Sequence, residues 1–316
     1  MKASAIIRIC IWSFVTLLLC GLLVCGVVFD TWNIKQWSGN WGGYSYGESS
    51  TYSIGDTELD ADSIHSLKVD WVSGSIHIAA YDGDTILVTE TTPSKRDHAL
   101  RWRVRDGVLQ IRYCKPYRFF GGSRITPKEL TVYLPFSSQL GKANLQELSI
   151  DNVSADIHLG EISVNELDID SVSAEMYIQN MEINSMELEN VSGAVRLNNC
   201  TVNSLEIDTV SGNITVEGAV GMVNMQTVSG FLDIFSARCP SYLSAQSVSG
   251  AIRLAIPATT PGFRLQMNAL SSSLNARDFA IHATGSGSYL YGDGSAVFDI
   301  ECVSGKVEIQ KIYTEE

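Results

Sequence analysis

Four arginines on two neighbouring segments are the side chains best suited to bind a charged ligand. Residues 95–128 hold ten of the 22 Lys and Arg residues but only two acids, in a chain whose net charge is −13. Alternate residues of a β-strand lie on one face, and a row of guanidinium groups suits carboxylates and phosphates. We therefore predict an anionic-ligand patch made of Arg101, Arg103, Arg105 and Arg112. The alternative is a solvated hairpin that balances acidic residues elsewhere in the chain.

Carboxylates recur at one position of an internal repeat, two residues before a recurring valine. Stacked at the spacing of neighbouring strands, about 5 Å, they would repel one another and favour a bound cation such as calcium. The Gly-Gly-x-Gly-x-Asp turn of calcium-binding β-rolls is absent, so we expect a solvated acidic face and no metal site. The column reads Asp70, Asp151, Asp170, Glu189, Asp208, Gln226, Gln246, Asn268 and Glu301.

No arrangement of residues in the sequence is typical of a catalytic centre. The five histidines are scattered, and the serine of a recurring Val-Ser-Gly motif repeats for structural reasons. We predict no catalytic residues, no cofactor and no enzymatic activity. A polysaccharide lyase or hydrolase on a β-helix is the alternative, because clustered carboxylates in a cleft could serve such an enzyme. Nucleic acid is not expected as a partner of an acidic chain without a binding-module signature.

The register of the repeat assigns two of the seven cysteines. Cys200 falls in an inward apolar column with Ile162, Met181 and Ala219, where it would act as a small buried hydrophobe. Cys200 and Cys239 are about two rungs apart, roughly 10 Å, which exceeds the ~7 Å limit between the Cα atoms of a disulfide. We expect no disulfide between them. Cys302 shares a corner column with Asn152, Ser171, Asn190, Thr209 and Thr227.

The repeat that creates these columns has a period of about 19 residues. Each copy reads apolar-x-apolar-acid/amide-x-Val-Ser-Gly/Ala-x-apolar-x-apolar, and a fixed period in this range is typical of stacked repeats. Two longer strands and one short strand per rung predict an all-β fold, a parallel β-solenoid with the Gly or Ala of each motif at a tight corner. The central valines are Val153, Val172, Val191, Val210, Val228 and Val248.

The two ends of the solenoid depart from the repeat. The first copy, residues 67–78, is followed by hairpin signals such as Asp106-Gly107, which predict a cap over the open edge of the first rung. The insertion at residues 277–295 is rich in Gly and Ser and predicts a loop or an extra hairpin. We expect this insertion and the basic cap to be the functional surfaces.

An uncharged apolar run lies near the N-terminus. Ile9 to Phe29 matches the ~20 residues that cross a bilayer, and Lys2 and Arg8 before it favour a cytoplasmic N-terminus. We predict a single-pass protein of the cell membrane with extracellular repeats. A cleaved signal peptide and a lipoprotein signal at Cys20 or Cys25 are the alternatives.

The predicted organisation has five parts. They are a cytoplasmic N-terminus (1–8), a transmembrane helix (9–29), a Gly- and aromatic-rich linker (30–57), the first rung with its β-hairpin cap (58–140), and β-solenoid repeats with an irregular C-terminal end (141–316).

The repeat motif, the Asp82-Gly83 and Asp106-Gly107 turns and a Gly-Asp-Gly-Ser-Ala loop before the last Val303-Ser304-Gly305 resemble a known family. This is the bacterial β-strand-repeat "putative adhesin" family, also called toastrack domains. The resemblance covers roughly residues 59–309 and implies binding, adhesion or envelope-stress sensing without a catalytic site. The partners it suggests, besides a membrane reached through the N-terminal helix, are anionic wall polymer, lipid headgroups or another envelope protein.

Overall fold

A computed structural model of the chain describes residues 43–91, 97–118, 126–136 and 142–313. These residues form β-strands and two short 3-10 helices, and no α-helix occurs among them. They divide into two compact units, residues 43–176 and residues 177–313. We call these the N-terminal unit and the C-terminal unit and describe each by itself.

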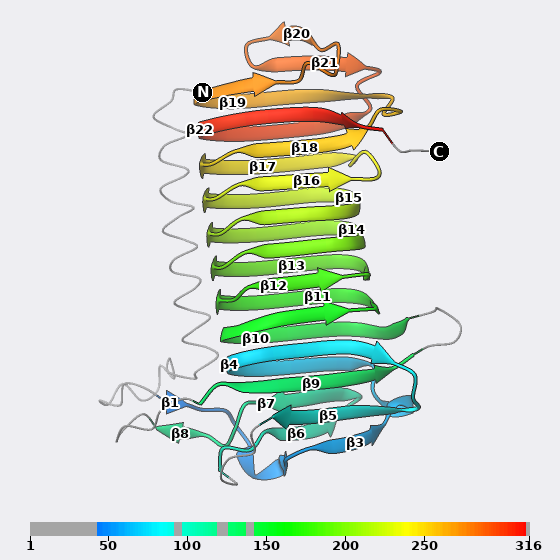
Figure 1. Cartoon of the computed structure of the whole chain (residues 1–316), viewed down its shortest axis with the longest axis vertical. Helices are drawn as coiled ribbons and strands as arrows, with labels where there is room; N and C mark the ends of the chain where they lie inside the picture. Colours follow the sequence, from blue (N-terminus) through cyan, green and yellow to red (C-terminus); the bar gives the residue numbers. More distant parts are fainter. Residues whose placement is uncertain (1–42, 92–96, 119–125, 137–141, 314–316) are drawn as a thin grey trace. The chain divides into compact units, whose positions relative to one another are not determined.

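The N-terminal unit is built on three long strands that stack in parallel, β10 on β4 and β11 on β10 (Figure 1). Their register repeats the sequence motif, so that Leu67, Leu148 and Leu167 lie in one buried row. The elements of the unit are β1 (Gly43–Tyr44), η1 (Ser49–Thr51), β2 (Ser53–Ile54), β3 (Thr57–Asp60), η2 (Ala61–Ser63), β4 (Ser66–Tyr81), β5 (Thr85–Thr91), β6 (Arg101–Arg105), β7 (Val108–Arg112), β8 (Tyr117–Arg118), β9 (Lys128–Pro135), β10 (Ala143–Gly160) and β11 (Ile162–Ser173).

The other edge of β4 is covered, as predicted, by the segment that interrupts the repeat. β7 pairs in parallel with the first half of β4, and β9 pairs in parallel with its second half. The hairpin of β6 and β7 turns at Asp106-Gly107, where both residues have positive φ, as a tight two-residue hairpin turn requires. β5 adds to β9 and β3 adds to β5, both antiparallel. Parallel pairing with the cap thus leaves β4 without a free edge over most of its length.

The C-terminal unit is built on its own ladder of parallel strands (Figure 1). One inward row runs through Met186, Leu205, Val223 and Leu243, all buried. The strands are β12 (Met176–Gln179), on which the division between units falls, β13 (Glu182–Ser192), β14 (Val195–Ser211), β15 (Ile214–Ser229), β16 (Leu232–Ser236), β17 (Tyr242–Ser249), β18 (Ile252–Pro257), β19 (Gly262–Asn275), β20 (His282–Gly285), β21 (Ser288–Gly292) and β22 (Ala296–Ile312).

The last strand of this unit does not follow the order of the sequence. β22 pairs with β17 and β18 on one side and with β19 on the other, so the final rung lies between two earlier ones. β19 then pairs along its first residues with β21, which forms an antiparallel hairpin with β20 (Figure 1). The insertion at residues 277–295 is therefore the extra hairpin that was one of the two predicted forms.

The corner of each rung explains the small residues of the motif. A Cβ atom on Gly230 would collide with the carbonyl oxygen of Gly212, and one on Gly250 would collide with that of Gly230. Both glycines also have positive φ, 137° and 150°. In the N-terminal unit the Asn152 side chain closes the corner, because its Nδ2 donates to the Ala155 carbonyl at 2.7 Å and its Oδ1 accepts from the Ala155 amide.

The predicted membrane topology requires a correction. Residues 9–29, predicted as a transmembrane helix, lie outside the described residues. Within the described ranges no helix is long and apolar enough to cross a bilayer, because apolar residues there alternate along strands and the only helices are three-residue turns. The predicted location, a single-pass protein of the cell membrane with extracellular repeats, is therefore not supported by the structure.

Candidate functional site

The four arginines of the predicted patch do come together in the N-terminal unit. Arg101 lies opposite Arg112 in the β6–β7 hairpin, and Arg103 lies opposite Gln110. Arg101, Arg103 and Arg105 alternate along β6, so all four guanidinium groups belong to one face of the hairpin. We call this the arginine face.

The chain's own residues cover much of the arginine face. Glu48 accepts hydrogen bonds from Arg103 Nη1 at 2.8 Å and from Arg105 Nη1 at 3.2 Å. The Arg103 hydrogen bond, with Arg105 beside it, lowers the pKa of the Glu48 carboxyl. The Arg103 guanidinium also lies 4.5 Å from the ring centre of Tyr52, and Arg112 forms an ion pair with Asp70. These partners come from residues 48–52 and from β4, and no sequence spacing pointed to them. Whether the face binds an external anion stays a prediction.

Two residues of the acidic column have basic partners in the N-terminal unit, whereas Asp208 has acidic neighbours in the C-terminal unit. In the N-terminal unit Asp151 lies 3.4 Å from Lys68, and Asp70 meets Arg112. In the C-terminal unit Asp208 lies among other acids of β13 and β14. Burial, with repulsion from Glu206 and its neighbours, raises the pKa of Asp208 to about 7. Among the described residues no group of three or more His, Cys, Asp or Glu side chains is arranged to hold a metal ion.

The cysteines lie where the register predicted, with one shift. Cys200 is buried, but a bulge in β14 places it opposite Gly218 instead of Ala219. Cys302 is buried in the corner row that also contains Ser247, Thr227 and Thr209. None of the four cysteines in the described part of the chain, Cys114, Cys200, Cys239 and Cys302, forms a disulfide bond.

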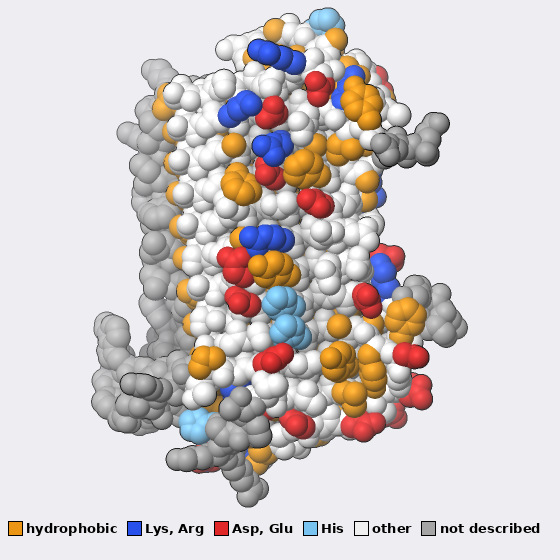
Figure 2. Space-filling model, in the orientation of Figure 1, with side chains coloured by type: hydrophobic (Ala, Val, Ile, Leu, Met, Phe, Trp, Pro, Cys, Tyr) orange, Lys and Arg blue, Asp and Glu red, His pale blue; other side chains and the backbone are white. Residues whose placement is uncertain are grey.

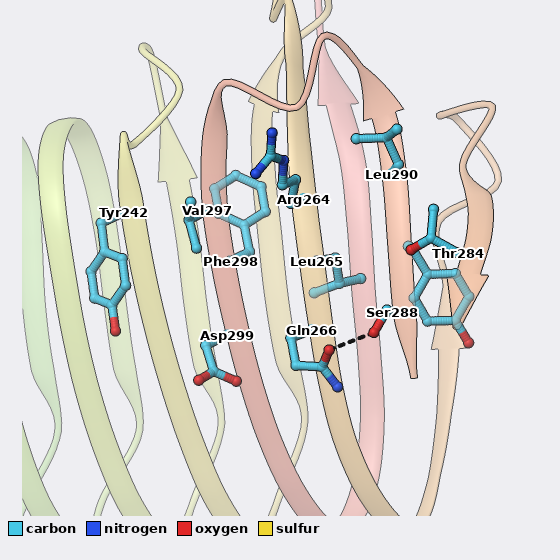
Figure 3. Close-up of a pocket in the computed structure, with 11 residues that line it drawn as sticks. Tyr242, Arg264, Leu265, Gln266, Thr284, Ser288, Leu290, Val297, Phe298 and Asp299 are labelled. Carbon is cyan, nitrogen blue, oxygen red and sulfur yellow. Dashed lines mark hydrogen bonds between the residues drawn. The ribbon is translucent and has the colours of Figure 1, made fainter. Parts of the chain in front are cut away.

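A pocket of about 400 Å³ lies in the C-terminal unit, on the outer face of the strands that surround the inserted β22 (Figure 3). Tyr242 on β17, Val297 on β22 and Arg264 on β19 occupy equivalent positions of three neighbouring strands. Two residues further along, Asp299 and Gln266 lie opposite each other in the ladder. The lining residues are Tyr242, Arg264, Leu265, Gln266, Thr284, Ser288, Tyr289, Leu290, Val297, Phe298 and Asp299.

Hydrogen bonds fix the polar groups along one side of the pocket. Ser288 Oγ donates to Gln266 Oε1 at 2.6 Å, and the Gln266 amide donates to Asn268 Oδ1 at 3.5 Å. Asn268 in turn donates to Glu301 Oε1 at 3.3 Å. This chain of contacts orients the Gln266 amide before any ligand arrives.

Two charged groups of the pocket lack partners. Asp299 Oδ1 is shielded from water and has no hydrogen-bond partner among the described residues, and burial raises the pKa of this carboxyl. Arg264 is exposed, and no carboxylate of the described chain lies within ion-pair distance of its guanidinium group. Figure 3 shows Asp299 beside Gln266, with Arg264 above them and Tyr242 at one side. The buried Oδ1 acceptor without a donor costs free energy, and a ligand in the pocket reaches this carboxyl at its other oxygen.

An exposed apolar row leads into the pocket. Met222, Tyr242 and Val297 occupy equivalent positions of β15, β17 and β22, and each is more than 40% exposed. Over the strands of the C-terminal unit, Figure 2 shows apolar side chains interspersed with both acidic and basic ones. Such a mixture favours a ligand that offers both apolar and polar surface.

Only one part of the pocket lining was predicted from the sequence as a functional surface. The insertion at residues 277–295, predicted as a functional surface, contributes Thr284 and the residues 288–290. Arg264, Gln266 and Asp299 were not singled out, because they fall at ordinary outward positions of two rungs. Only the placement of β22 beside β19 brings them together.

Several solved structures match most of this chain at low sequence identity. A structure titled "putative cell adhesion protein" from Clostridium sporogenes has 10% sequence identity and a TM-score of 0.27, covering 83% of this chain and 100% of that one. A "putative adhesin" from Parabacteroides distasonis has 19% identity and a TM-score of 0.44, covering 81% and 97%. A "putative lipid binding protein" from the same species has 13% identity and a TM-score of 0.37, covering 82% and 96%.

The search of curated proteins found no match. The family model described as Toastrack DUF4097 matches residues 64–310, which include the capped first rung and the repeats of both units. The chain belongs to the toastrack family.

Proposed function

We propose that this toastrack protein is a non-catalytic binding module of the adhesion type, and that it holds its ligand in the pocket of the C-terminal unit. The observation that carries the proposal is the pair of unpartnered groups, Asp299 and Arg264, beside an amide that is already oriented. All of these side chains project from strands of one ladder, which holds them more precisely than a loop would.

A carbohydrate-active enzyme is the second candidate, and Asp299 is the observation that favours it. A carboxyl whose pKa is raised by burial can act as a general acid, and a glycosidase pairs it with a second carboxylate. The nearest acid on the same face of β22 is Glu301. It lies outside the pocket lining and accepts a hydrogen bond from Asn268, which makes it a poor partner for catalysis.

The test separates binding from turnover. The full chain is immobilised and exposed in turn to anionic wall polymer, phosphatidylglycerol vesicles and a purified envelope-protein extract. We expect one class of probe to be retained saturably and recovered unchanged, and retention to fall at least tenfold in the variant Arg264→Gln. A release of reducing or unsaturated sugar that Asp299→Asn abolishes would establish the enzyme instead. If no probe is retained by the wild-type chain, the binding proposal is wrong.

A further inference from the structure

The Asp299 carboxyl is suited to bind a hydroxyl group of the ligand. The carboxyl is half-buried and lines the pocket; its Oδ1 atom is shielded from water, so a ligand meets this carboxyl at the other oxygen. A hydroxyl group both donates and accepts, so it can satisfy this carboxyl whether the carboxyl is ionised or protonated. An ammonium group could satisfy only the ionised form. The Gln266 amide beside it offers a second, pre-oriented site for a neighbouring hydroxyl.

Arg264 is suited to bind an anionic group of the same ligand. No carboxylate of the described chain lies within ion-pair distance of its guanidinium group; the residue lies opposite Val297 in the ladder and lines the pocket. A Cβ atom on Gly294 would come within 3.0 Å of Arg264 Nε, so the arginine side chain packs against the turn before β22. A planar, positively charged fork held in this way suits a carboxylate or a phosphate.

Tyr242 and Val297 offer a flat apolar surface next to these polar groups. The Tyr242 side chain is 43% exposed and that of Val297 is 44% exposed, on the outer face of neighbouring strands. A tyrosine ring is rigid and presents a large apolar area, with its hydroxyl group free for water or ligand. The C–H face of a sugar ring matches such a surface, while the hydroxyl groups at its edge can reach Asp299 and Gln266.

The floor of the pocket disfavours an extended peptide. β22 has β17 on one side and β19 on the other, so the main-chain groups of these strands are used in the ladder. Peptides that bind sheets do so through free main-chain groups at an edge. The pocket offers side-chain hydroxyl, amide, carboxyl and guanidinium groups instead, and its volume of about 400 Å³ falls in the usual range for small ligands.

We propose that the pocket binds a sugar residue that carries a carboxylate, of the uronic-acid type, and this inference rests on the proposed binding function. The ring lies on Tyr242, hydroxyl groups meet Asp299 and Gln266, and the carboxylate meets Arg264. Among the expected partners this selects an acidic polysaccharide over a lipid headgroup.

The experiment compares a uronic acid oligomer with its uncharged ester. Isothermal titration of the full chain uses trigalacturonate, its methyl ester and phosphatidylglycerol vesicles as probes. We expect wild-type protein to bind trigalacturonate at least tenfold more tightly than the ester, and Arg264→Gln to bind both equally. Tyr242→Ala should lose affinity for both probes. The matched control is Arg253→Gln, a partly exposed arginine of the same unit, which lies 3.6 Å from Asp233 and should leave binding unchanged.

The outcomes distinguish this inference from the proposed function. If trigalacturonate does not bind while vesicles or another probe bind in a manner that depends on Tyr242 or Arg264, the sugar inference is wrong and the binding function stands. Equal affinity of wild-type protein for the acid and its ester would overturn the role of Arg264. If none of the probes binds, both proposals fail. Thermal unfolding of each variant confirms that it is folded, as expected for substitutions at exposed positions.

Discussion

Lys128 is buried in the N-terminal unit, with its ammonium group between a carboxylate and two aromatic rings. The side chain is 2% exposed, and Nζ lies 2.6 Å from Glu90 Oε2 and 2.8 Å from the His98 carbonyl. The ring centres of Trp71 and Tyr113 lie 4.8 and 4.3 Å away. This lysine was counted with the basic surface of the cap, but its charge is satisfied internally and burial lowers its pKa.

Removing only one partner of this buried pair should be costly. We expect Lys128→Met to lower the free energy of unfolding by about 3–5 kcal/mol, because the Glu90 carboxylate is left buried without its counter-ion. The double variant Lys128→Met with Glu90→Gln should recover a large part of that loss. Urea unfolding at pH 7, followed by circular dichroism, measures both. If the double variant is as unstable as the single one, the pair is not the source of the effect.

Asp208 should make the stability of the protein depend on pH. Its neighbours on β13 and β14 are Glu187, Glu189 and Glu206, whereas β15 presents the uncharged Asn224 and Gln226. Because its folded-state pKa is raised from 3.8 to about 7, the folded chain binds this proton more tightly than the unfolded chain. The resulting stability is present below pH 3.8 and is lost as the pH rises through about 7.

The variant Asp208→Asn isolates this effect. We expect it to be more stable than wild type at pH 8 by on the order of 2 kcal/mol, which allows for the partial exposure of the carboxyl, and by clearly less at pH 5, where only part of the loss has occurred. Unfolding titrations at both pH values measure the difference. Glu217→Gln, at an exposed acid of β15, serves as the control, and its effect on stability should be the same at both pH values. Equal effects of Asp208→Asn at pH 5 and pH 8 would contradict the assignment.

At the scale of the element, the segment from β1 to β2 controls access to the arginine face. Tyr44 and Tyr52 are buried and anchor the segment, while Glu48 lies exposed between Arg103 and Arg105 with a positive φ of 53°. Glu48 therefore occupies the position that an external anion would take. The carboxylate competes directly with any ligand for the same hydrogen-bond donors.

If the arginine face binds anions, Glu48→Gln should tighten that binding. We expect the affinity for phosphatidylglycerol vesicles at low salt to rise several-fold in this variant and to fall below wild type in Arg103→Glu. Co-sedimentation at two salt concentrations measures both, because contacts with exposed charges weaken as salt increases. Asp84→Asn, an exposed acid in the turn before β5, removes the same charge elsewhere and should have little effect. An unchanged affinity in Glu48→Gln would remove the arginine face as a candidate.

Most of the repeat structure of this fold could be predicted from the sequence, but the pocket could not. The inward rows, the polar corner row with Cys302 and the small residues at the corner follow from a period of about 19 residues, since identical positions must stack when rungs do. The Asp106-Gly107 pair between two alternating segments predicted the β6–β7 hairpin. The pocket could not be predicted, because it depends on the insertion of β22 between strands that precede it in the sequence. Nothing local to β22 encodes that choice of neighbours.

At the scale of the whole molecule, the main electrostatic feature is an excess of negative charge. The chain has 35 acidic and 22 basic residues, and parallel stacking places acids opposite acids on neighbouring strands. In the C-terminal unit Glu187 lies opposite Glu206, and Glu189 lies opposite Asp208. Like charges that face each other across a ladder are destabilising, and their repulsion is reduced by salt. The same charges keep neighbouring molecules apart and oppose association.

The stability of the folded chain should therefore rise with ionic strength. We expect the melting temperature at pH 7.5 to increase by a few degrees between 0.02 and 0.3 M NaCl, about the range over which the Debye length falls from roughly 20 to 6 Å. The variant Glu187→Gln with Glu206→Gln removes one stacked pair and should show a smaller increase. Asp84→Asn with Glu217→Gln removes the same net charge, but Glu217 faces Asn198 and Phe235 across its ladder, so the salt dependence should stay close to that of wild type. If the two double variants respond to salt equally, net charge and not the stacking of acids governs stability.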